Sequence, residues 1–428
     1  MNTIWNELKL QDSISYYIGG GWGEDDYKEE LKPAFVIRGT DMPYIRDGYY
    51  NEIPFRFHKV SNISKRILEE NDIILEVSGG SKDQLVGRSI IVKKDLLNFL
   101  SPSAICASFC KLIRPDKNVV YPKFLYMWLR TIYSNGEIGK YQIQSTGISN
   151  FQFEAFIKHA KIQLPDLPTQ KRIAEILSAY DDLIENNNRR IALLEKAAQE
   201  LYKEWFVRFR FPGYENAKFE NGLPEGWEYI RFGNAIEIID GDRGVNYPKQ
   251  EEFYEEGECL FLNAGNVTKN GFDFSSCAYI TKEKDQLLRK GKLQTGDVVL
   301  TTRGTVGNVA FLNETMTFSP MRINSGMVIL RNLGVVSPEY IYTALRHESL
   351  QKAMMMYASG SAQPQLPIKD MRRIKIIKAD AKTMDKFTKY VADIYKQVSL
   401  MIMKNQAISK QRDLLLPRLM SGKLEVRE

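Results

Sequence analysis

The residues that could carry out chemistry are few, and their spacing does not suit catalysis. The run Gly19–Gly23 lacks the spacing and the following helix of a dinucleotide site, and no GxxxxGK[ST] phosphate loop occurs. The three histidines, His58, His159 and His347, belong to no HExxH sequence, and no GxSxG nucleophile is present. An Asn-Pro-Pro-aromatic tetrapeptide, which would hold an amino group for methyl transfer, is also missing. The sequence therefore predicts no catalytic residues and favours a protein that binds.

The cysteines and the overall charge narrow the class of protein further. Cys106, Cys110, Cys259 and Cys277 form no CxxC pair and lie far from the histidines, which favours buried thiols over a metal site or disulfides. The net charge of +6 permits a polyanionic partner without requiring one. Because no apolar stretch approaches membrane-spanning length and no N-terminal signal is seen, we expect a cytoplasmic protein without a membrane partner.

Two halves of the chain resemble each other. Residues 71–79, Asn-Asp-Ile-Ile-Leu-Glu-Val-Ser-Gly, correspond to residues 296–304, Gly-Asp-Val-Val-Leu-Thr-Thr-Arg-Gly, which lie 225 positions later. The same distance of 225 relates residues 37–42 to residues 262–267. Identity is sparse but the order is preserved, as in a diverged duplication. The repeat is long enough to be a whole domain.

Each half has the elements of an α+β domain. Short β-rich runs such as Phe35–Ile37 and Ile73–Leu75 are separated by Gly, Asp and Asn turns, and a helix is expected near Pro122–Tyr133. The second half repeats the pattern with a strand at Asp297–Thr302 and a helix near Pro338–His347. The connecting loops differ far more than the strands, so we expect specificity to lie in the loops.

A long helix is predicted after each domain. Apolar residues follow Ile173 in alternating steps of four and three, and the same pattern recurs 214 residues later with one charged exception, Arg412. Arg412 either packs locally or serves a partner helix. Thr169 is the expected N-cap of the first helix, Pro212–Gly213 closes it, and Pro417 ends or kinks the second. The residues predicted to pair the helices are Ile173, Leu177, Ile184, Asn187, Ile191, Leu194, Leu201, Val391, Ile394, Val398, Asn405, Ile408 and Leu415.

The polar seam positions suggest how the two helices pair. If the helices run antiparallel and overlap fully, with Ile173 opposite Leu419, then Asn187 lies opposite Asn405. Buried seam asparagines cost stability and are tolerated where they fix register. We therefore expect an antiparallel coiled coil, although one asparagine in ten seam positions also arises by chance. The apolar run at 206–211 either awaits a partner helix or packs under the second domain.

Three passages resemble one protein family. Residues 163–187, QLPDLPTQKRIAEILSAYDDLIENN, resemble the central conserved helix of the specificity subunits of type I restriction–modification systems. Residues 223–227, LPEGW, look like the opening of a second target-recognition domain, and residues 415–424, LLPRLMSGKL, look like the family's C-terminal ending. The resemblance covers essentially the whole chain, and the three motifs come in the order that the family requires.

The resemblance implies an architecture and a set of partners. It implies two similar α+β target-recognition domains, 1–165 and 213–380, related by a pseudo-twofold repeat and joined by helices at 166–212 and 381–428. Such a subunit is not an enzyme. Each domain reads one half of an asymmetric sequence in double-stranded DNA, and the helices recruit two modification (methyltransferase) subunits and, through them, restriction (motor-nuclease) subunits. No cofactor is expected on this chain, because S-adenosylmethionine, ATP and Mg would be bound by the partners.

If the chain reads DNA, its loops should combine cations for phosphates with amide or guanidinium groups that reach base edges. In the second domain Arg303 is the leading candidate, because it leaves a strand end beside Gly304 and Gly307, which let the backbone approach a duplex. The full set of expected DNA-binding residues is Arg38, Arg46, Ser78, Gly79, Ser81, Lys82, Asp240, Arg243, Asn263, Asn266, Lys269, Thr302, Arg303, Gly304 and Thr305.

Three other hypotheses stay open at this point. The chain could be the DNA-specificity subunit of another methyltransferase or defence system, which would differ in the partner that copurifies. A protein scaffold without DNA would show no salt-dependent DNA affinity. An enzyme with unfamiliar motifs would act without added subunits.

Overall fold

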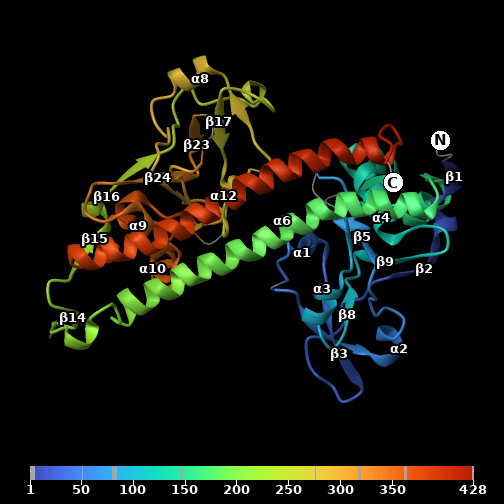
Figure 1. Ribbon diagram of the computed structural model, residues 1–428, viewed down its shortest axis with the longest axis horizontal. Helices are drawn as coiled ribbons and strands as arrows, with labels where there is room; N and C mark the ends of the chain where they lie inside the picture. The colour runs from blue at the N-terminus through green and yellow to red at the C-terminus, as the bar shows by residue number, and fades with distance from the viewer. Residues whose placement is uncertain are drawn as a thin grey trace. The chain divides into compact units, whose positions relative to one another are not determined.

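The computed structural model describes residues 5–50, 52–79, 84–145, 148–274, 276–316, 320–360 and 364–426. The chain forms two compact units, whose residues can be followed by the colour bar of Figure 1. The first unit comprises Met1–Arg189 and Ala407–Glu428, and the second comprises Arg190–Gln406. Among the described residues, no helix combines the length and the apolar character needed to cross a membrane.

The first unit is built on a four-stranded antiparallel sheet with the order β2-β9-β5-β7. All four residues of its strand β5 are buried, which explains why the strand begins with the apolar run Ile73–Leu75 after Asp72. A second sheet has the order β4-β3-β8, with β3 and β8 parallel, and β1 pairs with β12. The strands are β1 Asn6–Lys9, β2 Ile14–Gly19, β3 Leu31–Ile37, β4 Phe55–Lys59, β5 Ile73–Glu76, β6 Ser78–Gly79, β7 Ser89–Ile91, β8 Ala104–Cys106, β9 Cys110–Pro115, β10 Gln142–Ser145, β11 Ile148–Phe151 and β12 Lys161–Leu164, and the helices are α1 Met42–Arg46, α2 Val60–Ile63, α3 Lys94–Phe99, α4 Pro122–Ser134 and α5 Phe153–His159.

The second unit repeats this topology. Its four-stranded antiparallel sheet has the order β16-β24-β21-β22, and its second sheet has the order β20-β17-β23, with β17 and β23 parallel. The strands are β13 Phe219–Glu220, β14 Leu223–Pro224, β15 Glu228–Arg231, β16 Ile236–Asp240, β17 Cys259–Leu262, β18 Val267–Thr268, β19 Gly271–Phe272, β20 Tyr279–Ile280, β21 Val298–Thr301, β22 Val309–Phe311, β23 Met321–Ile323, β24 Met327–Asn332 and β25 Lys375–Lys378, and the helices are α7 Phe232–Ala235, α8 Lys282–Leu287, α9 Pro338–Arg346, α10 Glu348–Tyr357 and α11 Ile368–Met371.

An ion pair inside each sheet confirms the duplication at atomic detail. In the first unit, Arg114 on β9 binds both carboxylate oxygens of buried Asp72 at 2.8 Å. In the second unit, Arg331 on β24 binds both oxygens of buried Asp297, at 2.9 and 2.7 Å. Each aspartate also accepts a backbone N–H from the residue three positions before it, at 2.7 Å in both units. Each aspartate therefore starts a buried strand in the same way, 225 residues apart.

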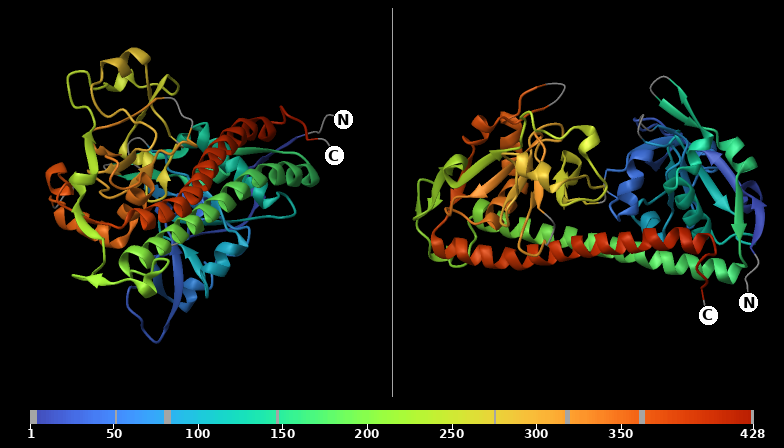
Figure 2. Two further views of the ribbon diagram at one scale, coloured as in Figure 1. Left: turned by 60° about the vertical axis from the view of Figure 1, so that its left-hand side comes forward. Right: turned by 90° about the horizontal axis from the view of Figure 1, so that it is seen from above.

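Two long helices contribute to both units. Helix α6 covers Leu167–Tyr202 and continues as a π-helical turn at Lys203–Val207, and helix α12 covers Ala381–Met420 with Pro417 inside its last turn. Figure 2 shows both helices, α6 in green and α12 in red. The first helix thus ends before the predicted Pro212.

The prediction that Thr169 caps α6 is wrong. The side chain of Asp166 accepts the backbone N–H of Thr169 at 2.8 Å, so the aspartate before the helix is the cap. Asp380 caps α12 in the same way, accepting from the N–H of Thr383 at 3.0 Å. An aspartate at this position satisfies a free N–H of the first turn and places negative charge at the positive end of the helix.

The seam residues are buried inside each unit. In the first unit, Ile173 and Leu177 of α6 share a core with Leu416 and Leu419 of α12. In the second unit, Ile191 of α6 packs with Val398 and Met401 of α12, and Val391 joins the core of that unit. Within each unit, residues of both helices therefore lie in the same core. All of the predicted pairing residues named above are buried or half-buried.

An arginine of each domain is paired with a carboxylate of α6. In the first unit, Arg130 on α4 binds Asp181 at 2.6 Å, and Arg412 of α12 binds the same carboxylate at 2.6 Å. In the second unit, Arg346 on α9 binds Glu195 at 2.7 Å. Arg412, the charged exception in the seam, thus packs locally against Asp181.

The apolar run after α6 packs under the second domain. Phe206 and Phe211 are buried there against Trp227, and Phe209 is half-buried beside the same ring, whereas Val207 is exposed. The LPEGW passage is therefore a packing element, with Trp227 at its centre.

The cysteine prediction is confirmed for three of the four thiols. Cys106, Cys110 and Cys259 are buried and Cys277 is half-buried, and all four are free. Burial raises the pKa of Cys106 to about 12, so this thiol stays protonated and unreactive.

Candidate nucleic-acid interface

In the second unit, a short loop after β23 joins several of the predicted site residues. This loop, Asn324–Gly326, is named the second hub loop. The carbonyl of Gly326 accepts the backbone N–H of Thr302 at 2.8 Å and that of Arg303 at 3.2 Å. The N–H of Asn324 donates to the carbonyl of Leu262 at 2.9 Å, directly before Asn263. Two candidate clusters that are about forty residues apart in the chain thus meet at one loop.

The third candidate cluster, 240–244, reaches the same loop. A Cβ atom on Gly241 would lie 2.2 Å from the carbonyl oxygen of Asn324, so only glycine allows this close backbone approach. The guanidinium of Arg243 donates to the carbonyl of Ser325 at 3.3 Å and pairs with Asp240 at 3.0 Å. The structure therefore brings all three clusters of the second domain together.

Arg303 lies at the centre of this surface. Its backbone is held by the hub loop and by a bridge to Gln365, and its half-buried side chain has an Nε atom for which the described residues supply no acceptor. Gly304, the next residue, has a φ of +72°, and a Cβ atom added to it would meet no neighbouring atom within 4 Å, so the chain is open here. A buried donor without a partner is costly and is suited to an incoming acceptor.

Other predicted residues shape the loops from inside. The amide of Asn266 is 3% exposed and donates to the carbonyls of Asp273 and Ser276 at 2.9 and 2.8 Å. Thr302 is 5% exposed, and its hydroxyl donates to the carbonyl of Gly326 at 3.1 Å. Asn263 is exposed, although its side-chain oxygen accepts the N–H of Gly265. The exposed candidates that remain are Lys269, Gly304 and Thr305.

We call the place where these segments meet at a hub loop the junction. The first unit repeats the junction with different side chains. Its hub loop, the first hub loop, is Ala107–Phe109. The carbonyl of Phe109 accepts the N–H of Val77 at 2.8 Å and that of Ser78 at 3.3 Å, and the N–H of Ala107 donates to Ile37 at 2.8 Å. A Cβ on Gly20 would lie 2.1 Å from the carbonyl oxygen of Ala107. The backbone contacts match those of the second unit one by one.

Three predicted residues of the first domain stand beside this loop. Arg38 follows Ile37 and pairs with Asp41 at 2.6 Å, and the hydroxyl of Ser78 donates to the side chain of Asn150 at 2.9 Å. Gly79 follows with a φ of +132°. Ser81 and Lys82 lie outside the described residues.

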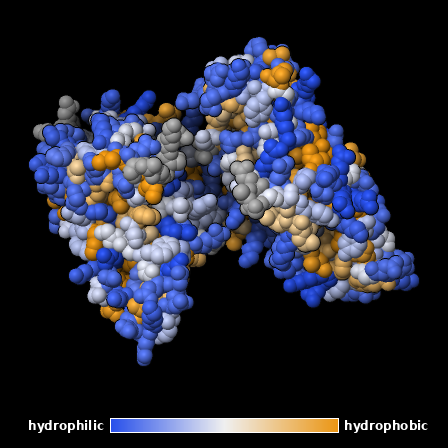
Figure 3. Space-filling view, turned by 180° about the vertical axis from the view of Figure 1, so that it is seen from behind, coloured by the Kyte–Doolittle hydropathy of each residue, from blue (hydrophilic) through white to orange (hydrophobic). Residues whose placement is uncertain are grey.

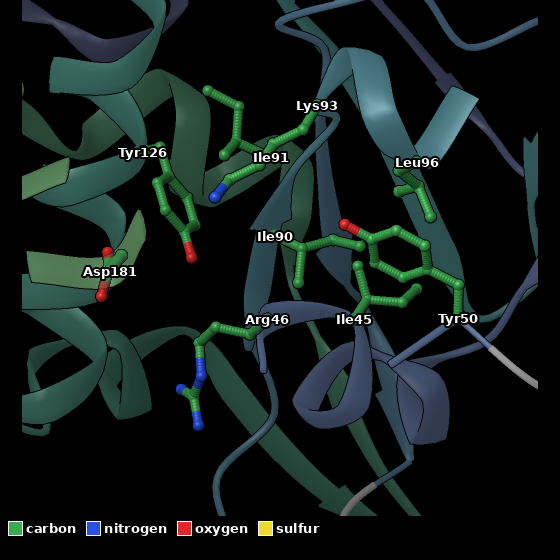
Figure 4. A pocket seen from close by; sticks show the side chains of 9 residues that line it. All are labelled: Ile45, Arg46, Tyr50, Ile90, Ile91, Lys93, Leu96, Tyr126 and Asp181. Atoms are coloured by element: carbon green, nitrogen blue, oxygen red, sulfur yellow. The ribbon is translucent and has the colours of Figure 1, made fainter. Parts of the chain in front are cut away.

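Arg46 is placed elsewhere. It ends α1 and lines a pocket that also contains Tyr126 and Asp181, as Figure 4 shows. Lys93 lines the same pocket and pairs with Asp182 and Glu185 of α6 at 2.8 and 2.7 Å. This pocket belongs to the contact between the first domain and α6.

Sequence reasoning missed a basic pair at the second junction. Arg289 and Lys290 are exposed, and the N–H of Arg289 donates to Asp242 at 2.7 Å. Burial raises the pKa of Asp242, but the N–H groups of Gly244, Arg289 and Lys290 outweigh it and hold the pKa below its usual range. Asp242 thus stays charged and fixes the pair in place. The signal in the sequence that could have predicted this site is a basic pair directly before a glycine, Arg289-Lys290-Gly291.

The visible face in Figure 3 is mainly hydrophilic in each unit, with scattered apolar patches. Among the residues that the structure describes, no group of three or more His, Cys, Asp or Glu side chains could hold a metal ion. The arrangement offers cations, amides and backbone groups, which suit the binding of a polyanion.

Comparisons with known proteins agree on one family. The family described as "Type I restriction modification DNA specificity domain" matches residues 29–196 and 224–408. The type I restriction enzyme MjaIX specificity subunit of Methanocaldococcus jannaschii is 27% identical over 99% of this chain and 94% of its own. The HindI specificity subunit of Haemophilus influenzae is 23% identical over 90% of this chain and 94% of its own. A crystal structure of a type I S subunit from M. genitalium superposes with a TM-score of 0.55 at 17% identity, covering 98% of this chain and 96% of that one, which shows a shared fold.

Proposed function

This chain belongs to the type I restriction–modification DNA specificity family, and we propose that the hub-loop surface of each domain reads one half of its DNA target. The chain is a sequence-specific DNA-recognition subunit for a bipartite, asymmetric target, and subunits of this kind are not catalytic. The family match falls on two segments of the chain, which fits one domain for each half-site. We take 1–165 and 213–380 as the two reading domains.

The observation that supports this assignment is the repeated junction. In both units the same backbone contacts join three segments of the main sheet. These are the glycine after its first strand (Gly20 or Gly241), the end of its buried strand (β5 or β21) and the hub loop before the strand that pairs with it (β9 or β24). The backbone frame is shared, whereas the side chains on it differ. A frame that holds variable side chains rigidly can read two different base sequences with one fold.

The proposed roles of the residues follow from their exposure. Arg303, whose buried Nε finds no acceptor in the described part of the chain, is assigned to base edges, and Arg243, Lys269, Arg289 and Lys290 are assigned to phosphates. Arg38 takes a corresponding role in the first half, and Ser81 and Lys82, which lie outside the described residues, stay predicted DNA contacts. The other described residues of the set hold the loops or let the backbone approach the duplex: Ser78, Gly79, Asp240, Asn263, Asn266, Thr302, Gly304 and Thr305.

We further propose that α6 and α12 form one antiparallel coiled coil in which Asn187 faces Asn405. Its outer faces would recruit two modification subunits, and these would bring restriction subunits in the full complex. The chemistry then belongs to the partners, which would use S-adenosylmethionine, ATP and Mg, while this chain binds no cofactor.

The experiment that tests the function is selection from a random duplex library. The chain is coexpressed with a candidate modification subunit, and the bound DNA is sequenced after selection at two salt concentrations. We expect a motif with two specified halves around an unspecified gap. Binding that only fades as salt rises, without any enriched sequence, would leave a general affinity for polyanions and contradict the proposal.

A scaffold that binds only protein would give neither an enriched motif nor salt-dependent DNA binding. A DNA-specificity subunit for another effector would enrich a motif but would copurify with a different partner. The same experiment therefore separates the alternatives.

A further inference from the structure

An aromatic side chain projects from the first hub loop. Phe109 is 61% exposed, although its backbone carbonyl anchors both Val77 and Ser78. The next residue, Cys110, is buried and its N–H donates to the carbonyl of Ala107 at 2.8 Å. The backbone of Phe109 is therefore held on both sides while its ring faces outward.

The ring of Phe109 does not hold the loop together. In the second unit the equivalent residue is Gly326, and its carbonyl makes the same two hydrogen bonds, to Thr302 and Arg303. Neither Phe109 nor Gly326 has a positive φ, so the backbone there suits any residue. The ring belongs to none of the buried clusters of the described part of the chain. The exposed ring of Phe109 is therefore available to contact a ligand.

The neighbours of Phe109 favour a close approach by a duplex. Gly20 touches the first hub loop, and Gly79 follows Ser78, so two of the adjoining positions carry no side chain. Arg66 donates to the carbonyl of Gly19 at 2.8 Å, which holds a cation near the same glycines. An apolar ring on a loop next to glycines matches a base edge that carries a methyl group.

We propose that Phe109 is a specificity-determining residue whose ring contacts the 5-methyl group of a thymine in the major groove of the first half-site. The inference rests on the proposed function and adds a base class to one of its two reading surfaces. Thymine is the one base whose major-groove edge presents a methyl group, so an apolar side chain there selects it. Gly326 offers no such group, so the second half-site lacks this contact.

The test replaces thymine by uracil, which removes only the methyl group. The chain is assembled with its modification subunit, and its affinity is measured for the selected target and for duplexes with single uracil substitutions. We expect one substitution in the first half-site to weaken binding about 3- to 10-fold, in line with the loss of one buried methyl contact. With Phe109→Ala, thymine and uracil at that position should bind equally.

Matched variants separate the ring from general effects. Phe99→Ala removes an exposed phenylalanine of the same domain that lies against Tyr50 rather than on the hub loop, and it should leave the uracil effect intact. Phe109→Leu keeps an apolar side chain and should keep part of the preference. Phe109→Ala should leave the reading of the second half-site unchanged and should keep the other base preferences of the first half-site, which shows that the first domain of the variant is folded.

Several results would overturn the inference. These are a first half-site that requires no thymine on either strand, a wild type indifferent to every uracil, or an equal loss by Phe109→Ala on thymine and uracil. In each of these cases a two-part motif would still be selected. Failure of the proposed function itself would appear as the absence of any such motif.

Discussion

The substitution Arg303→Ala should change DNA reading without harming the fold. The loop is held by backbone N–H groups of Thr302 and Arg303 that donate to Gly326, and neither contact involves the guanidinium. The buried Nε has no acceptor among the described residues, and an unsatisfied buried donor costs about 1–3 kcal/mol. We therefore expect the free energy of unfolding to stay the same or to rise slightly.

The expected loss in binding follows from what an arginine does at a base edge. A good bidentate contact with guanine contributes about 1–3 kcal/mol of discrimination, which is roughly a 5- to 150-fold change in affinity. Because Arg303 belongs to the second unit, the loss should fall on base changes in one half-site only. Arg303→Lys keeps the charge but not the fork of donors, so it should retain the salt dependence and still lose discrimination.

The assay is competition binding by the assembled complex on duplexes that carry single base changes in either half of the selected motif. Arg373→Ala is the matched control, because this arginine is in the same unit with a side chain that is 68% exposed and pairs only loosely with Asp370, at 3.7 Å. Equal weakening at both half-sites would show a general electrostatic role. No change with Arg303→Ala, or an equal change with Arg373→Ala, would refute the reasoning.

Two further predictions concern the helices. Asp181→Asn should leave Arg130 and Arg412 facing each other with only the exposed carboxylate of Asp413, 2.8 Å from Arg412, as a counter-charge, and breaking such a buried pair costs about 3–5 kcal/mol. Burial raises the pKa of Asp181, but Arg130 and Arg412 outweigh it and lower the pKa, so the contribution exists above the ordinary value of about 4 and fades in acid. Chemical unfolding of the first unit should thus show a gap between wild type and variant that narrows as the pH falls below about 4; a constant gap would contradict the assignment. For the coiled coil, Asn187→Leu and Asn405→Leu should each destabilise by about 1–3 kcal/mol, and the double variant should recover most of that loss. Additive losses in thermal unfolding would mean that the two asparagines do not face each other.

Much of the fold was predictable because its signals are local and repeated. The apolar runs after Asp72 and Asp297 became the central strands β5 and β21, and Pro122 and Pro338 became the first residues of α4 and α9. These signals depend on residue types at fixed spacing, which a single sequence displays. One exception was the cap of α6, where two capping residue types, aspartate and threonine, stand three positions apart.

The candidate site was predictable only as a set of clusters. The junction itself is made by backbone atoms of the two hub loops, and a carbonyl group leaves no trace in residue type. Asn263 and Asn266 look alike in the sequence, yet Asn263 is exposed and Asn266 is buried. The fold of the following hairpin decides which amide turns inward. Arg46 also looked like a loop cation, and the structure places it at a pocket beside α6.

The duplication explains how one chain can read an asymmetric sequence. If the contacts that shape each junction were made by side chains, divergence of the two halves would have changed both the frame and the reading surface at once. The frame is instead made by carbonyl and N–H groups and by Gly20 and Gly241, which tolerate change around them. The side chains on this backbone frame have diverged. For example, the position that holds Phe109 in the first unit holds Gly326 in the second. Divergence could therefore alter either half of the target without disturbing the other half or the helices that join the domains.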